Sequence, residues 1–343
     1  MSNENRKGIA CGGQWIIDRV KLVDHYPEEQ SVAMILGETM GGGGGAHNVT
    51  LNLARFDPDL PVVAVGMIGN DADGDWIMNE CGQYPNIRTD QLKRTPEART
   101  SYADVFSVKS TGKRTFFHDR GANRLFSPAT VDVDRLNAAL FHLGYLLLLD
   151  GMDKPDPQYG RVSARFLHGL RERGIKTSID LVSIHSPDFV DVVSPALRHT
   201  DYCIINDFES EKLTGVPVRR EGSVSIENLE QSADRIFEKG VHELVIVHFP
   251  EGAFAKTRAG ETRLQPSLDL PAGFIVGSTG AGDSFCAGML YGLNAGWGLD
   301  RSLEFAVCAG AQNLRDLTTT GSITRWQEIL KLKDQYPFRK WTG

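Results

Sequence analysis

The stretch from 277 to 285 reads Gly-Ser-Thr-Gly-Ala-Gly-Asp-Ser-Phe, a turn of small residues that ends on a carboxylate and leads into an apolar helix pattern. Small residues ahead of a helix leave backbone N–H groups exposed at the positive end of the helix dipole, where anions bind. An aspartate at such a position is often only a helix cap. Whether this one caps a helix or performs chemistry depends on the rest of the chain.

Length and charge limit the class of protein. A chain of 343 residues is long enough for one large α/β unit or for a core with a smaller appendage. The net charge of −7 argues against a nucleic-acid partner and favours a small-molecule ligand. The polar N-terminus and the lack of a long apolar run argue against a membrane partner. The five scattered cysteines indicate reduced thiols, so we expect a cytoplasmic protein.

From about residue 140 onward, short apolar runs alternate with amphipathic stretches. This pattern predicts a parallel sheet with crossover helices. The expected strands are 145–149, 177–179, 202–205 and 244–247, and the expected helices are 158–173, 226–239 and 285–294. Ligands of such sheets bind beyond the carboxyl ends of the strands. The residues to inspect are therefore Asp150, Asp180, Asn206 and His248.

The first part of the chain has a different pattern. Its expected strands are 9–17, 32–36, 100–108 and 114–118, the last two joined by a hairpin turn at 110–113. Helical patterns at 48–55 and 73–80 interrupt them. We therefore predict a small antiparallel β-sheet lid whose strands are interleaved with the core. On this view residues 1–343 are a single unit, with lid strands within 9–45 and 98–123 and the α/β core in 46–97 and 124–330.

Five consecutive glycines at 41–45 precede Ala46-His47-Asn48 and an apolar helix pattern. Glycines allow backbone conformations closed to other residues and let a ligand lie against bare peptide groups. The spacing matches neither a dinucleotide-binding fingerprint nor a phosphate-binding P-loop. Taken alone, the run is either a flexible loop or part of a ligand site.

Together and in this order, the motifs of the chain resemble those of the ribokinase-like (PfkB-type) family of carbohydrate kinases, over nearly its whole length. The motifs that carry the resemblance are Gly43-Gly44 through Asn48 with Asn52-Leu53-Ala54-Arg55, the segment 65–74, Gly112-Lys113-Arg114-Thr115-Phe116 with Gly121-Ala122-Asn123, Asn206-Asp207-Phe208-Glu209, and Gly280-Ala281-Gly282-Asp283. The resemblance implies a three-layer α/β/α core with a mostly parallel central sheet and a small β-sheet lid.

The resemblance also implies an activity, the ATP-dependent phosphorylation of a carbohydrate hydroxyl. A sugar hydroxyl is a poor nucleophile, so a carboxylate must accept its proton as the phosphoryl group arrives. Asp283 is the candidate base. The backbone N–H groups of Gly280, Ala281 and Gly282 are the candidate anion hole for the transferring phosphoryl oxygens.

On the nucleotide side, the resemblance assigns Asn206 and Glu209 to the magnesium ion, with Glu209 acting through water. The alternative is a capping box, in which Asn206 caps the following helix and Glu209 lies in its first turn. Both can hold together. Gly252, in the segment after the strand at 244–247, and Asn313, near the expected adenine pocket, are the other nucleotide-binding candidates.

For the acceptor, the resemblance indicates the carboxylate of Asp18, the backbone of Gly43 and Gly44, and the amide of Asn48. A carboxylate and an amide suit paired sugar hydroxyls. His118 and Arg120 end the last lid strand, and a guanidinium there would suit an acidic or phosphorylated sugar. The alternatives are a solvated strand end for Asp18 and an exposed side chain for Arg120.

The sequence departs from the family pattern in two places that bear on function. Gly277 stands where an acidic or polar residue commonly begins the second signature, which puts activation by potassium in doubt. The segment His248-Phe249-Pro250-Glu251-Gly252 replaces a Thr-x-Gly-x-x-Gly pattern beside the nucleotide. We also expect the apolar lid to form a homodimer interface. The rival functions are a nucleoside kinase of the same superfamily and a catalytically silent sugar-binding regulator.

Overall fold

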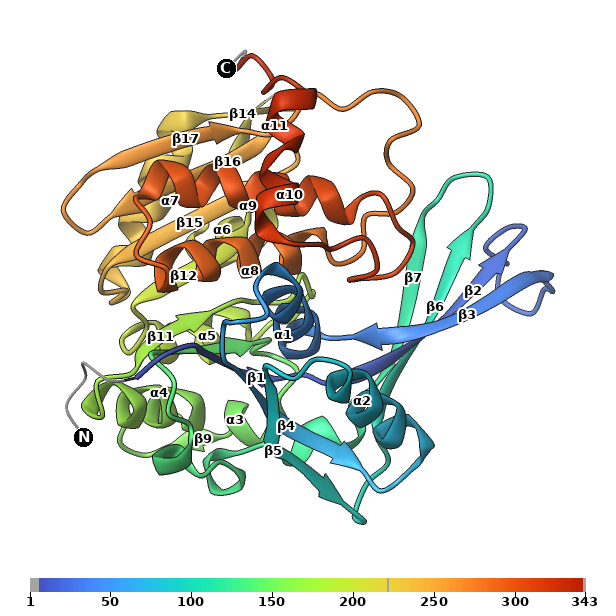
Figure 1. Ribbon diagram of the computed structural model, residues 1–343, viewed down its shortest axis with the longest axis horizontal. Helices are drawn as coiled ribbons and strands as arrows, with labels where there is room; N and C mark the ends of the chain where they lie inside the picture. The colour runs from blue at the N-terminus through green and yellow to red at the C-terminus, as the bar shows by residue number, and fades with distance from the viewer. Residues whose placement is uncertain (1–5, 221, 342–343) are drawn as a thin grey trace.

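A nine-stranded sheet forms the centre of the computed structural model, which describes residues 6–220 and 222–341 (Figure 1). Seven neighbouring strands are parallel, and two antiparallel strands close one edge. In spatial order they are β17 (Thr262–Pro266), β16 (Gly252–Thr257), β15 (Leu244–Phe249), β12 (Tyr202–Asn206), β11 (Lys176–Ile179), β8 (Leu140–Gly144), β1 (Ile9–Gly13), β4 (Val62–Gly69) and β5 (Ile87–Thr95).

Helices cover both faces of this sheet, because each central strand directs apolar side chains to both faces. In β1, for example, Ile9 and Cys11 join one core cluster while Ala10 joins the other. One face carries α1 (Gly45–Phe56), α2 (Ala72–Gly82), α8 (Ala281–Asn294), α9 (Leu299–Asn313), α10 (Trp326–Leu330) and α11 (Leu332–Gln335). The other carries α3 (Asp150–Asp153), α4 (Val162–Glu172), α5 (Phe189–Leu197), α6 (Asp207–Thr214) and α7 (Ile226–Glu238). The predicted three-layer α/β/α core is confirmed.

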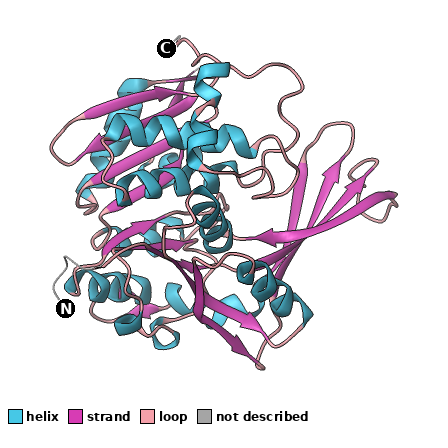
Figure 2. Cartoon of the chain, in the orientation of Figure 1, coloured by secondary structure: helices cyan, strands magenta, loops and turns pink. Residues whose placement is uncertain are grey.

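A separate four-stranded sheet, the lid, projects from the body and is visible on the right of Figure 2. Its strands, in spatial order, are β3 (Ile35–Gly43), β2 (Ile16–Val23), β6 (Ser101–Val108) and β7 (Arg114–Asp119). The smaller sheet is as predicted, but it is mixed rather than antiparallel, because β2 runs parallel to β6. Two further pairs of two-residue strands lie elsewhere: β9 (Pro155–Asp156) with β10 (Gly160–Arg161), and β13 (Arg219–Arg220) with β14 (Ser223–Val224).

Three strand predictions were wrong, two in their bounds and one because the stretch is a loop. The stretch 9–17 is two strands, since Gly13 has φ +135° and turns the chain from the central sheet into the lid. The expected strand at 32–36 begins only at Ile35. The expected strand at 145–149 is a loop, and Asp150 begins α3 rather than ending a strand. That loop is apolar because Leu146, Leu147 and Leu149 are buried in the core.

The later strands were predicted closely, and each expected helix overlaps an observed one, although α4 begins at Val162 rather than 158 and α8 at Ala281 rather than 285. Strands β11, β12 and β15 contain the stretches 177–179, 202–205 and 244–247. All five cysteines are buried and free of disulfides. Within residues 6–220 and 222–341, none of the helices combines the length and apolarity needed to cross a bilayer. The assignment of the whole chain to one unit and to the cytoplasm stays a prediction.

A glycine lets α8, which carries the signature turn, lie close against α9. A Cβ added at Gly288 would come 2.8 Å from the Cα of Ala306 on α9. We expect Gly288→Ala to lower the free energy of unfolding by about 1–3 kcal/mol, because the helices must separate. The helical Gly82 has open space around it and is the matched control. Gly82→Ala should leave the stability unchanged or raise it by up to about 1 kcal/mol. Urea denaturation measures both, and equal effects would contradict the packing argument.

Candidate active site

The turn before α8 places a carboxylate at the helix N-terminus. Gly280 precedes the helix with φ +83°, and a Cβ there would lie 2.5 Å from the carbonyl oxygen of Thr319. Only glycine fits this conformation and this close approach. The first N–H groups of a helix have no partner within the helix. Gly280 is the N-cap of α8, Ala281 and Gly282 are its first two residues, and the Ala281 N–H donates to the Ser278 carbonyl at 3.4 Å. The predicted anion-hole residues and the predicted base are therefore adjacent in space as well as in sequence.

Two side chains from distant parts of the chain hold Asp283. Its Oδ2 accepts a hydrogen bond from Asn48 Nδ2 at 2.7 Å, and its Oδ1 accepts one from the Tyr145 hydroxyl at 2.5 Å. Burial raises the pKa of Asp283, while these two hydrogen bonds and the nearby His47 act in the opposite direction. The sequence indicated Asn48 but not Tyr145, which was predicted to begin a strand and instead follows β8 in a loop.

A cavity of about 710 Å³, here called the lid cavity, lies between the lid and the carboxyl ends of the central strands. Its lining includes most of the residues predicted to bind an acceptor, together with the signature turn. The predicted residues in its wall are Asp18, Gly44, Asn48, His118, Asn206, Glu209, Gly280, Gly282 and Asp283. Gly43 stands just behind this wall, where a Cβ would come 2.3 Å from Asp18 Oδ2. A glycine at 43 thus leaves room for that carboxylate.

The lid contributes one polar row to this cavity. Asp18 on β2, Ala103 on β6 and His118 on β7 are register neighbours, so a carboxylate and an imidazole flank a small alanine. Burial raises the pKa of Asp18 to about 6, although His47 opposes this effect. Burial lowers the pKa of His118, with Arg120 acting in the same direction, so this imidazole is neutral at pH 7. The row therefore offers hydrogen-bond acceptors and donors rather than positive charge.

Arg120 and Arg114 have different surroundings. The Arg120 guanidinium forms an ion pair with Asp150 and donates to the Leu147 carbonyl at 3.3 Å. Arg120 is not among the described residues that line the lid cavity. It ties the end of β7 to the loop before α3. Arg114, which the sequence did not single out as a site residue, lines the cavity near Asp18. Strand alternation could have found it, since 114, 116 and 118 share a face of β7.

Two more carboxyl groups stand at the ends of neighbouring strands. Asp180 follows β11, and Glu209 lies in the first turn of α6 after β12. Glu209 and Asn206 form a capping box, and the Glu209 carboxylate also accepts from Ser183 Oγ at 2.9 Å. Burial raises the pKa of Glu209 to about 7, and burial together with the charges of Glu209 and Asp283 raises that of Asp180. Mutually repelling buried carboxyl groups with amide and hydroxyl oxygens beside them fit a hard divalent cation such as Mg²⁺.

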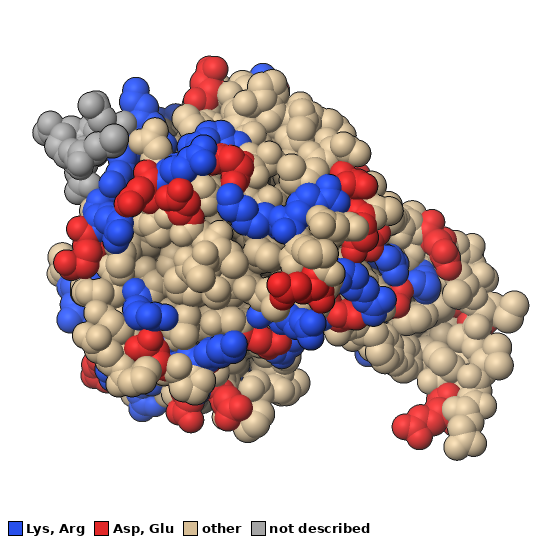
Figure 3. Space-filling model, turned by 90° about the horizontal axis from the view of Figure 1, so that it is seen from below, with Lys and Arg blue, Asp and Glu red and all other residues tan. Residues whose placement is uncertain are grey.

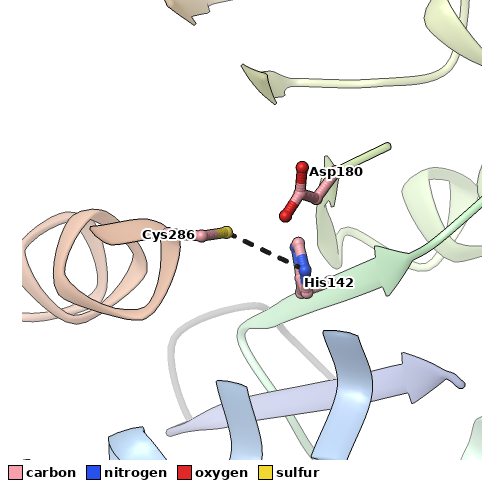
Figure 4. A group of neighbouring side chains, drawn as sticks. All are labelled: His142, Asp180 and Cys286. Carbon is pink, nitrogen blue, oxygen red and sulfur yellow. Dashed lines mark hydrogen bonds between the residues drawn. The ribbon is translucent and has the colours of Figure 1, made fainter. Parts of the chain in front are cut away.

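Below Asp180, towards the core, His142 and Cys286 complete a buried cluster (Figure 4). The Cys286 sulfur lies 3.9 Å from His142 Nε2, and Ser178 Oγ lies 3.2 Å from His142 Nδ1. Burial lowers the pKa of His142 to about 3 and raises that of Cys286, so both side chains are uncharged at pH 7. The cluster therefore supports the cavity floor without adding charge beneath Asp180.

A second cavity of about 510 Å³, the helix cavity, lies on the other side of the signature turn. Its wall includes the apolar side chains of Leu268, Ile275 and Val307. Gly252 lines it as expected, whereas Asn313 is outside its described wall and donates to the Thr319 carbonyl at 2.5 Å. Four residues line both cavities: Ser183, Asn206, His248 and Gly282. The two cavities therefore meet beside the turn that carries Asp283.

Gly277 is packed too tightly to be replaced without movement. A Cβ there would lie 2.6 Å from the Asp316 carbonyl oxygen and 3.4 Å from Arg114 Nη2. A side chain at position 277 would therefore require the backbone at Asp316 to shift. The doubt about potassium stays a prediction.

Comparison with known proteins agrees with this geometry. A family model described as pfkB family carbohydrate kinase matches residues 6–326. A 5-dehydro-2-deoxygluconokinase of Geobacillus thermodenitrificans is 37% identical over 308 residues, which are 87% of this chain and 85% of the relative. A ribokinase of Arabidopsis thaliana is 24% identical over 318 residues, which are 90% of this chain and 76% of the relative.

Solved structures share the fold. Arabidopsis thaliana ribokinase complexed with ribose and ATP has a TM-score of 0.78 at 20% identity, covering 95% of this chain and 98% of that one. A putative ribokinase II from E. coli in complex with ATP and Mg²⁺ has a TM-score of 0.75 at 18% identity, covering 96% of this chain and 99% of that one. The ribokinase-like fold predicted from the motifs is confirmed. The chain therefore belongs to the pfkB family and is a carbohydrate kinase, a phosphotransferase that acts on an alcohol group.

Proposed function

We propose that this protein transfers the γ-phosphoryl group of ATP to a hydroxyl of a small carbohydrate or sugar acid. The observation that carries the proposal is the meeting of the lid cavity and the helix cavity at Gly282, next to Asp283. The acceptor binds in the lid cavity and the nucleotide in the helix cavity, with the adenine towards the apolar side chains of its wall. The ATP-complexed neighbours and the 5-dehydro-2-deoxygluconokinase among the relatives support this assignment.

Asp283 acts as the general base in this proposal. The acceptor hydroxyl donates to the carboxylate, its oxygen forms the new bond to the γ-phosphorus, the bond from that phosphorus to the β,γ-bridging oxygen breaks, and ADP leaves. The hydroxyl proton ends on Asp283. The backbone N–H groups of Gly280, Ala281 and Gly282 stabilise the charge on the transferring oxygens. Side chains at the two glycines would obstruct the approach.

Asn206 and Glu209 are the residues that would hold magnesium, with Glu209 acting through water. When bound, Mg²⁺ neutralises charge on the nucleotide phosphates. Glu209 itself is kept in place by its capping box and by Ser183, so its carboxylate contacts Ser183 and Asn206, which line both cavities. The cap and the metal role are thus compatible functions of one side chain.

On the acceptor side, Asp18 and Asn48 bind sugar hydroxyls, and Gly43 and Gly44 keep the backbone close to the ring. Asp18 lies 8% exposed on β2, so its carboxylate faces the cavity rather than bulk solvent. Asn48 reaches the same cavity from the first turn of α1. His118 adds a neutral imidazole at the lid. Arg120 is left out of this set because it pairs with Asp150.

Replacing the base should slow the reaction strongly. We expect Asp283→Asn to lower kcat by about 10²–10⁴, because the amide cannot accept the hydroxyl proton. The exposed Asp59, away from both cavities, provides the control Asp59→Asn, which should keep full activity. A coupled assay of ADP release measures turnover across hexoses, pentoses, sugar acids, sugar phosphates and nucleosides, with and without potassium.

The same screen separates the alternatives. Undiminished turnover by Asp283→Asn would show that another group is the base. A preference for nucleosides over every sugar would favour a nucleoside kinase. A wild-type protein that binds a sugar but turns over no acceptor would favour the silent regulator.

Acceptor binding should depend on pH through Asp18. Its pKa of about 6 means that the carboxylate is ionised above that pH and protonated below it. We therefore expect kcat/KM for the acceptor to fall as the pH is lowered through about 6, since a protonated carboxyl accepts fewer hydrogen bonds. Steady-state kinetics from about pH 5 to 8 tests this. In Asp18→Asn the acceptor KM should rise, and its dependence on pH in this range should weaken; a KM that titrates as in the wild type would argue against Asp18.

We also propose a homodimer formed through the lid. Apolar side chains on the lid strands and their connections are exposed, including Val32 at 80%, Met34 at 61% and Phe117 at 55%. The projecting end of the molecule is mostly uncharged on the face in Figure 3, whereas acids and bases are interspersed over the body. A second copy that packs lid against lid would cover these side chains.

This interface predicts a change of oligomeric state. Met34→Glu combined with Phe117→Glu should convert a dimer to a monomer, because each copy would then place two charges in an apolar interface. Sedimentation velocity measures the change. Replacing the exposed Val190 on α5, away from the lid, by Glu is the control and should leave the dimer intact. A wild-type protein that sediments as a monomer at all concentrations would refute the interface.

A further inference from the structure

Tyr145 is a residue in the cavity wall to which neither the motifs nor the proposed reaction gives a role. Its hydroxyl donates to Asp283 Oδ1 at 2.5 Å, while Asn48 donates to Oδ2 at 2.7 Å. Each carboxylate oxygen has two lone pairs, so both remain able to accept one more hydrogen bond. Tyr145 therefore orients the carboxylate without blocking an acceptor hydroxyl.

The packing around Tyr145 fixes the direction of its ring. It follows β8 directly, and a Cβ added at Gly45, the first residue of α1, would lie 2.8 Å from its Cε1. A glycine at 45 thus lets the ring pass between the end of β8 and the start of α1. Burial and the charge of Asp283 raise the pKa of the Tyr145 phenol well above its usual range. The phenol consequently remains a donor at every working pH.

The charges around Asp283 make such a donor important. Asp18 on β2, Asp180 after β11 and Glu209 on α6 line the same cavity, and the charge of Asp283 acts on the pKa of each of them. Burial raises the pKa of Asp283 and so favours its protonated form. A protonated Asp283 could not accept a proton from the acceptor. Against this, His47 on α1 contributes an attractive charge, and Asn48 and Tyr145 contribute hydrogen bonds.

We propose that Tyr145 is a positioning residue that donates a hydrogen bond to Asp283 throughout the reaction, so that a carboxylate rather than a carboxylic acid faces the acceptor hydroxyl. The acceptor proton is transferred to Asp283, and Tyr145 keeps its own. This inference rests on the proposed role of Asp283 as the base.

The test compares Tyr145→Phe with Tyr84→Phe. Tyr84 accepts a hydrogen bond from Arg55 Nε and lies outside both cavities, so its variant controls for the loss of a phenol. We expect Tyr145→Phe to lower kcat at least tenfold near neutral pH, to move the acid limb of the kcat profile to higher pH, and to leave the KM for ATP unchanged. Tyr84→Phe should reproduce the wild-type profile. An unshifted acid limb in Tyr145→Phe would overturn the proposal.

A second variant covers the case in which Tyr145→Phe does not fold. Incorporation of 3-fluorotyrosine at 145 keeps the shape of the ring and makes the phenol a stronger donor. The acid limb should then move to lower pH, and an unmoved or raised limb would count against the hydrogen bond.

A direct readout separates this inference from the proposed function. Infrared titration of the Asp283 carboxyl band, identified by subtraction of the Asp283→Asn spectrum, reports its protonation without turnover. If the wild type turns over no acceptor, the proposed function fails, yet a higher pKa of Asp283 in Tyr145→Phe would still confirm the contact between the two side chains. Equal pKa values in the two proteins would overturn it.

Discussion

The hydrogen bond from Asn48 to Asp283 is the contact on which the arrangement of the site depends. It joins the first turn of α1 to the first turn of α8, 235 residues apart in the chain. A second buried hydrogen bond starts one turn further along α1, where Asn52 Nδ2 donates to Ser284 Oγ at 2.9 Å. The two bonds together fix the position of α1 relative to α8. Because buried polar groups are costly without partners, these amides specify one relative position of α1 and α8. The glycine run before α1 and the signature turn before α8 are thereby brought to one point.

Negative charge is the main electrostatic constraint at that point. The lid cavity holds four carboxyl groups, Asp18, Asp180, Glu209 and Asp283, and burial raises the pKa of all of them. Such a cluster is stable only with hydrogen-bond donors or cations close by. Tyr145, Asn48, Asn206 and Ser183 supply donors from the protein. Because the carboxyl groups need cations or hydrogen-bond donors beside them, a divalent cation and a hydroxyl-rich acceptor would be favourable ligands here.

The lid completes the site from outside the core. Its cavity face carries Asp18 and His118 beside the small Ala103, so the sheet forms a polar cover over the base. The ion pair of Arg120 with Asp150 anchors the end of β7 to the core. An arginine at a strand end can bind a ligand or form an ion pair with a neighbouring loop. A sequence does not distinguish the two roles, because both need the same exposed guanidinium.

The sequence by itself determined the fold class, the parallel strands β11, β12 and β15, and the residues of the signature turn. These follow from local rules: short apolar runs that alternate with amphipathic stretches predict parallel strands joined by helices, and glycines before a helix predict an anion site. The capping box of Asn206 and Glu209 is local as well, and it was foreseen. The loop at 145–149 was not, because a buried loop and a buried strand have the same apolar composition. The split of 9–17 was not either, because the turn depends on the backbone conformation of Gly13. Only the tertiary structure decided that Tyr145 meets Asp283, that Arg114 rather than Arg120 lines the lid cavity, and that the two cavities join at Gly282. Each of these depends on contacts between segments far apart in the chain, which no local pattern encodes.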